Sequence, residues 1–236
     1  MTTKESMNPN RTARAVGLLY IIPWILSFLA IFLRQSLILP GDAAATANNI
    51  IASESIFRLS IVGDLVVQVV FIVLVLLLYK LLKPVNKNLA LLMVILFLVS
   101  VPIAMLNMLN LFAALLLLSG ADYLIVFPVD QLQAFVTLFR DLHEVGIMIA
   151  YIFWDLWLFP LGYLVFKSGF LPRILGILLM ISCFGYLIDF FTFFLFPNFD
   201  LAINMFTGWA ELLLCLWLLI KGVNVEQWEK RALESA

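Results

Sequence analysis

The chain has 236 residues, of which 64% are hydrophobic and only 12% are charged. A mean hydropathy of +1.11 excludes an ordinary water-soluble globular domain, and a formal net charge of -1 excludes a basic nucleic-acid-binding domain. The composition is that of an integral membrane protein in contact with a lipid bilayer.

Six apolar segments are each long enough to cross a bilayer as a helix. A helix rises about 1.5 Å per residue, so roughly 20 residues span a hydrocarbon core of about 30 Å. In chain order the predicted spans are 15–38, 57–82, 89–118, 132–166, 174–196 and 201–220. The sequence therefore predicts a single all-α polytopic membrane domain over residues 1–236, with a six-transmembrane-helix bundle at 15–220 between an N-terminal segment, 1–14, and a C-terminal tail, 221–236.

The lysines and arginines predict how the bundle is oriented. With the N-terminus inside, the inner segments hold 11 of the 14 basic residues and the outer loops hold none. We therefore expect both termini in the cytoplasm. A cleavable signal peptide is the alternative, because AAATA follows the first apolar run, but that run is longer than a signal-peptide core and ends in Arg34.

The segment LPGDAAATANNIIASES follows the first predicted span. Asp42 stands where an N-cap would start a short helix, so we expect a surface helix that lies over the outer end of the bundle. Its small residues suit either a movable lid or a fixed connector, and both readings stay open.

The polar residues of each predicted helix share one face. A polar side chain that faces lipid is costly, so a shared face indicates a polar interior. In chain order the faces carry Tyr20 and Arg34, then Ser60, Asp64 and Gln68, then Asn107 and Asn110, then Arg140, His143, Glu144 and Asp155, then Tyr186 and Asp189, and finally Asn204 and Glu211. We expect a polar cavity in the outer half of the bundle, with Asp155 lying deeper towards the cytoplasm.

The candidate ligand-binding residues are the polar side chains predicted near that depth. They are Arg34, Arg58, Asp64, Asn107, Asn110, Arg140, His143, Glu144, Tyr186, Asp189, Asn204 and Glu211. The acids outnumber the arginines, so we expect some of these carboxyl groups to hold a proton or to await a cation.

Catalytic and metal chemistry find less support in the sequence. An HExxH zinc site needs a second histidine one turn after the first, but His143 is the only histidine and Ile147 occupies that position. No metal site is assigned, the catalytic residues stay unknown, and no cofactor is identified.

Three functions remain open. Binding or transport of a small molecule, an ion or a lipid head group is the leading one. An intramembrane enzyme would use Glu144 or Asp64 as general base with His143 as its partner. An accessory or sensor subunit would use the same polar groups only to hold helices together. Self-association as a homo-oligomer is left open.

Several long stretches resemble one known family. They are ARAVGLLYII, LPGDAAATANNIIASESIFRLSIVGDL, YKLLKPVNKNLALL, LHEVG and GYLVFKSGFLPRILGILLMISCFGYLIDFF, which together reach from about residue 11 to residue 211. They are similar to a family of bacterial and archaeal membrane proteins known as domain of unknown function 4386. The resemblance implies a multi-pass protein of a prokaryotic cytoplasmic membrane, and it carries over no catalytic residues.

Overall fold

The computed structural model describes residues 8–196, 203 and 208–235. These residues form helices and contain no β-strand, which confirms the all-α prediction. Five helical segments in this part of the chain are long and apolar enough to cross a membrane, so the protein is a multi-pass membrane protein.

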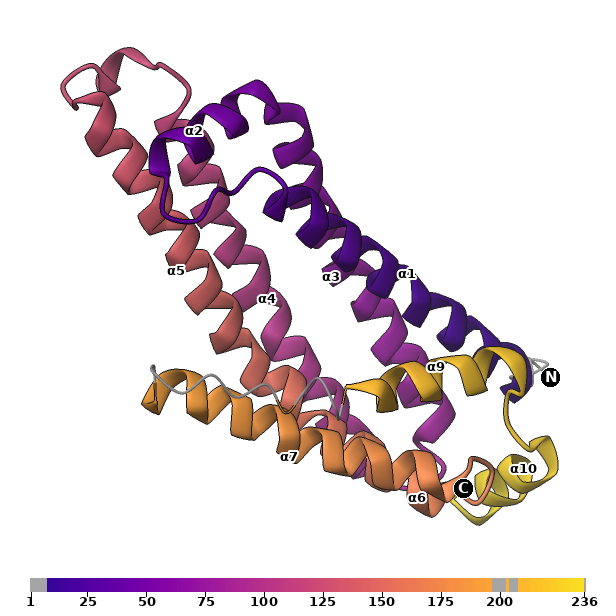
Figure 1. The fold of residues 1–236 in the computed structure, drawn as a ribbon. Helices are drawn as coiled ribbons and strands as arrows, with labels where there is room; N and C mark the ends of the chain where they lie inside the picture. Colours follow the sequence, from indigo (N-terminus) through magenta and orange to yellow (C-terminus); the bar gives the residue numbers. More distant parts are fainter. Residues whose placement is uncertain (1–7, 197–202, 204–207, 236) are drawn as a thin grey trace. The chain divides into compact units, whose positions relative to one another are not determined.

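The helices follow one another in the order shown in Figure 1. They are α1 (Pro9–Gln35), α2 (Ala43–Ala52), α3 (Glu54–Leu82), α4 (Lys87–Leu117), the 3-10 turn η1 (Asp122–Leu124), α5 (Val129–Leu156), α6 (Leu158–Ser168), α7 (Arg173–Leu195), α9 (Trp209–Ile220) and α10 (Val225–Glu234).

The fourth predicted span consists of two helices. α5 ends at Leu156 and α6 begins at Leu158, with Trp157 between them. Proline has no backbone N–H, so Pro160 cannot donate the hydrogen bond that would continue the ladder to the carbonyl four residues earlier. The interruption at Trp157 is the expected result.

The sixth predicted span, 201–220, is helical from Trp209 to Ile220 in α9. This apolar helix has 12 residues, and residues 201, 202 and 204–207 of the predicted span lie outside the described part of the chain. A six-helix bundle therefore stays a prediction.

The chain divides into two compact units. Unit 1 comprises Met1–Ile21, Phe71–Ser100 and Tyr151–Ala236, and unit 2 comprises Ile22–Val70 and Val101–Ala150. Helices α1, α3, α4 and α5 each contribute residues to both units.

An aromatic cluster forms part of the interior of unit 1. Phe97 has its ring centroid 5.0 Å from that of Phe71 and 5.0 Å from that of Trp157, while the ring of Tyr20 lies 6.2 Å from Phe71. Tyr20 and Trp157 are almost completely buried. Rings at these separations add favourable quadrupolar contacts to the area that they bury.

Glycines allow α6 and α7 of unit 1 to pack backbone to backbone (Figure 1). A Cβ atom at Gly162 would come within 2.7 Å of the carbonyl oxygen of Gly176, and a Cβ at Gly176 would come within 2.5 Å of the carbonyl oxygen of Gly162. Small residues permit this close approach of membrane helices, and any larger side chain would push them apart.

Unit 2 has an apolar core to which α2 contributes. Its buried residues are Leu37, Ile50, Phe57, Ile61, Met108, Leu111, Ala114, Leu115 and Val136. Because Ile50 belongs to α2 and is 3% exposed, this short helix is packed into the core of the unit.

Candidate functional site

An ion pair joins α1 to α3 in unit 2. Arg34 Nη1 lies 2.5 Å from Asp64 Oδ2, and the two side chains are only 13% and 15% exposed. Arg34 stands in the last turn of α1, where the helix dipole favours a positive charge. The structure thus brings together two of the residues predicted to line a polar site, and it neutralises both charges.

A second polar network joins α4 to α5 in unit 2. Asn107 Nδ2 donates a hydrogen bond of 2.8 Å to the backbone carbonyl of His143 and lies 3.1 Å from His143 Nδ1. Asn110 Nδ2 donates to Asn107 Oδ1 at 2.8 Å. Gly146 makes room for this network, because a Cβ atom there would meet Asn107 Oδ1 at 2.0 Å.

A small cavity lies beneath α2 in unit 2. Its volume is about 20 Å³, roughly the space of one water molecule. Its wall is formed by Arg34, Ile38, Thr46, Ile50, Phe57, Leu111, Ala114, Val136, Thr137 and Arg140. Two arginines from different helices therefore contribute to a lining that is otherwise mostly apolar.

Helix α2 starts at the residue that the sequence predicts. The side chain of Asp42 accepts a hydrogen bond of 2.8 Å from the backbone N–H of Ala45, as an N-cap residue does. Thr46 Oγ1 accepts from the backbone N–H of Leu39 at 2.9 Å, and Asn49 Nδ2 donates to the carbonyl of Leu37 at 3.2 Å. Local contacts with the segment before α2 thus hold the helix over the cavity.

Three of the predicted site residues lie nearer the surface of the described structure. Arg58 forms an ion pair of 2.6 Å with Glu54, and both side chains are about half exposed. Arg140 bonds to Asp141 at 2.7 Å and keeps 29% of its side chain exposed. Glu144 is exposed on α5, and no hydrogen bond joins it to His143 among the described residues.

The remaining predicted residues belong to the last third of the chain. Glu211 accepts a hydrogen bond of 2.7 Å from the hydroxyl of Tyr20, and Asp189 accepts one of 2.8 Å from the backbone N–H of Ile203. Tyr186 is partly buried on α7. Asn204 lies outside the described residues.

Sequence reasoning did not single out two threonines in the cavity wall, Thr46 and Thr137. Thr46 is 5% exposed, and Thr137 lies one turn before Arg140 on α5. Thr137 could have been found from its spacing to Arg140, because residues three apart share a helix face.

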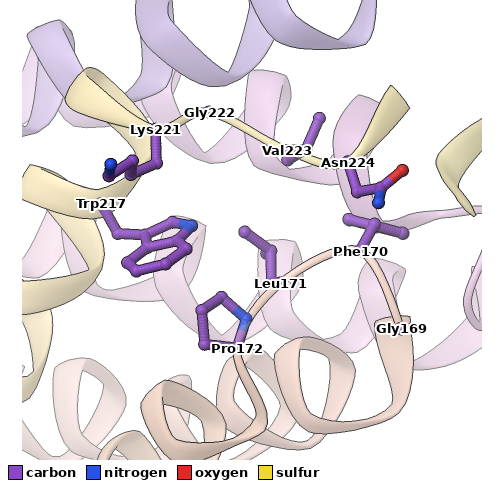
Figure 2. A pocket seen from close by; sticks show the side chains of 9 residues that line it. All are labelled: Gly169, Phe170, Leu171, Pro172, Trp217, Lys221, Gly222, Val223 and Asn224. Atoms are coloured by element: carbon purple, nitrogen blue, oxygen red, sulfur yellow. The ribbon is translucent and has the colours of Figure 1, made fainter. Parts of the chain in front are cut away.

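A larger, open depression of about 340 Å³ lies in unit 1, where the α6–α7 turn meets the end of α9. Figure 2 shows the side chains of Trp217, Leu171 and Pro172 around it. Lys221 is the one ionisable side chain among its lining residues. The side chain of Asn224, which also lines it, is occupied in capping α10, where it accepts from the N–H of Gln227. Although this depression is larger than the cavity in unit 2, its lining therefore offers few groups that could bind or act on a polar ligand.

Comparison with known proteins shows the family to which the chain is related. Residues 15–222 match the family described as "Domain of unknown function (DUF4386)". The chain belongs to the DUF4386 family. A similar protein of Archaeoglobus fulgidus (strain ATCC 49558 / DSM 4304 / JCM 9628 / NBRC 100126 / VC-16), named "Uncharacterized protein", is 32% identical over 168 residues, which is 71% of this chain and 86% of that protein. No solved structure matches.

The DUF4386 match begins inside α1, at residue 15, and covers all the described helices from α2 to α9. Arg34, Asp64, Asn107 and His143 all lie inside the matched range, as does the whole of α2. Both the ion pair and the asparagine–histidine network therefore belong to the family domain, while α10 lies beyond it.

Proposed function

We propose that unit 2 is a binding module for an amphiphilic anion, a molecule with an acidic head and an apolar tail such as an anionic membrane lipid. In this proposal the protein is a six-helix bundle of a prokaryotic cytoplasmic membrane, with both termini inside and α2 at the outer surface. The ligand sits beneath α2, with its head near Arg140 and Arg34 and its tail against apolar side chains.

The observation that carries this proposal is the composition of the cavity wall. Arg34 and Arg140 border it together with Ile50, Phe57 and Val136. A guanidinium group binds a carboxylate or phosphate through paired hydrogen bonds, whereas an apolar wall favours hydrocarbon. A wall that combines the two chemistries suits a ligand that combines them as well.

Arg140 is the arginine best placed to engage the acidic head. Its present partner, Asp141, is 54% exposed and follows it directly in the chain. Such a surface pair contributes little stability, so replacing it with a ligand phosphate costs little. Arg34 is already paired with Asp64 and serves to hold the wall in place.

The cavity is too small for any ligand larger than water, so binding requires α2 to move. Among the described residues, the side chains of Thr46 and Asn49 bond to the chain segment just before the helix, at Leu39 and Leu37, and to no other helix. Ile50 is its principal apolar anchor. We therefore assign α2 the role of a lid, which exchanges the contacts of Ile50 for contacts with the ligand tail.

The test compares the melting temperature of purified protein with phosphatidylglycerol, which is anionic, and with phosphatidylcholine, which is zwitterionic. Phosphatidylglycerol should raise the melting temperature of the wild type and of Arg58→Gln, whose arginine is paired at the surface and does not line the cavity. Arg140→Gln should lose that rise. Equal responses of Arg140→Gln and the wild type would overturn the proposal.

A further inference from the structure

Unit 1 contains a buried hydrogen bond between an acid and a phenol that the proposed lipid site does not use. The hydroxyl of Tyr20, on α1, donates to Glu211 Oε2, on α9, at 2.7 Å. Tyr20 is 0% exposed. About one turn after Glu211 on α9, the thiol of Cys215 donates to the backbone carbonyl of Gly17 on α1, so the two helices are in direct contact.

Asp155, near the end of α5, is the second acid of this region. It is 4% exposed, and its Oδ2 atom makes no hydrogen bond to the described part of the chain. The indole N–H of its neighbour Trp154 is likewise buried and has no partner among the residues that the structure describes. Asp155 lies within electrostatic reach of Glu211. Unit 1 therefore holds a buried carboxyl oxygen without a donor among the described residues, within electrostatic reach of a second carboxyl group.

The titratable groups around these two acids offer no positive charge. Those that interact with Asp155, Glu211 or the phenols beside them come from α1, α5, α7 and α9. They are Tyr20, Tyr151, Cys183, Tyr186, Asp189 and Cys215. Each is neutral or negative in its ordinary states, and no lysine, arginine or histidine belongs to this set within the described residues.

Two negative charges cannot share such a place without compensation. Burying one unpaired carboxylate in a membrane interior costs several kcal/mol, and a second like charge nearby adds to that cost. A proton on one carboxyl group removes one charge and turns that group into a hydrogen-bond donor. A proton on Asp155 would leave no charge on the carboxyl group whose Oδ2 atom lacks a donor among the described residues.

We propose that Asp155 and Glu211, with Tyr20 as a fixed hydrogen-bond donor, form a proton-binding site inside unit 1. Both carboxyl groups are neutral when the site is loaded, and release of one proton leaves the Glu211 carboxylate, held by the Tyr20 hydroxyl, while Asp155 keeps its proton. It is separate from the lipid site proposed for unit 2, and neither proposal depends on the other.

Labelling of the full-length protein with dicyclohexylcarbodiimide tests this site, because that reagent reacts with protonated carboxyl groups in apolar surroundings. Peptide mapping by mass spectrometry over roughly pH 5 to 8 should find the label on both Asp155 and Glu211 and show its loss from Glu211 as the pH rises. Asp64, which is paired with Arg34, is the internal control and should stay unlabelled. Asp155→Asn and Glu211→Gln should each lose the label at the substituted position.

A second measurement on the wild type keeps the test independent of how well the variants fold. The infrared carbonyl band of protonated carboxylic acids should weaken over the same pH range in which labelling of Glu211 is lost. Absence of both the label and the band at every pH would overturn the proposal. Suppression of labelling by sodium ions at constant pH would also overturn it, because the site would then bind a metal cation in place of a proton.

Discussion

Arg34 and Asp64 tie α1 to α3 through a contact of 2.5 Å between Nη1 and Oδ2. Both side chains are mostly buried, so removing one charge leaves the other without a partner in a medium of low dielectric constant. Arg34→Gln should therefore lower the free energy of unfolding by about 2 to 4 kcal/mol in detergent.

The double variant Arg34→Gln/Asp64→Asn is the matched control for this loss. It removes both charges together, so it should recover a large part of the stability lost in the single variant. Arg58→Gln breaks an exposed pair and should cost no more than about 0.5 kcal/mol. Equal losses for Arg34→Gln and Arg58→Gln would show that Arg34 is solvated.

Gly146→Ala should destabilise the contact between α4 and α5. The added methyl group would meet Asn107 Oδ1 at 2.0 Å, and that side chain is fixed by its hydrogen bond to the carbonyl of His143. We expect a loss of roughly 1 to 3 kcal/mol in the free energy of unfolding. Gly63→Ala is the control, since its nearest neighbour would be Ala30 Cβ at an ordinary 3.7 Å.

Truncating Asn107 removes the atom with which the new methyl group collides. Asn107→Ala/Gly146→Ala should therefore lose less stability than the sum of the two single variants. Strict additivity of the two losses would mean that α4 and α5 do not approach each other in this way.

Asp42→Ala should loosen α2 without unfolding the rest of unit 2. The variant removes the acceptor for the Ala45 N–H and should cost about 1 kcal/mol of local stability. Amide hydrogen exchange should become faster in α2, while α4 stays protected. Asp42→Asn keeps an N-cap acceptor and should exchange as the wild type does, so a similar acceleration in both variants would rule out the capping role.

The topology is testable with introduced cysteines. A cysteine at Asn48, which is exposed on α2, should react with a membrane-impermeant maleimide in intact cells, whereas one at Lys83 should react only after lysis. The native thiols of Cys183 and Cys215 are buried and give little background. Reaction of a cysteine at position 83 in intact cells would contradict the predicted orientation. The third predicted outer loop, around Asn198, lies outside the described residues.

Sequence patterns within single helices predicted several of the features that shape the candidate site in unit 2. The cap at Asp42 follows from its short polar side chain before a run of small residues, and the structure confirms it. Arg34 and Asp64 were each assigned to the polar face of their helix because a charge cannot face lipid cheaply. Helix α2 connects α1 to α3, and these two helices run in opposite directions. Arg34 and Asp64 were predicted at a similar depth, so their meeting in an ion pair agrees with that prediction.

Other features depend on how neighbouring helices pack and rotate relative to one another. The periodicity of polar residues within one helix does not determine that packing. The polar face assigned to α5 placed His143 and Glu144 together, yet His143 is 7% exposed and Glu144 lies on the exposed side. Residues next to each other on a helix differ by about 100° in direction, so a small rotation of α5 separates them. The backbone contact between Gly162 and Gly176 likewise needs two helices to be packed before it can be recognised.

Photocrosslinking tests the proposed lipid site most directly. An anionic lipid that carries a photoreactive group in its acyl chain would be irradiated with the purified protein, and the adducts would be mapped by mass spectrometry. We expect adducts at Ile50, Leu111 and Val136, competition by phosphatidylglycerol, and a strong reduction of the adducts in Arg140→Gln. Adducts confined to exposed apolar residues such as Phe28 and Leu106, with yields unchanged in Arg140→Gln, would contradict this site.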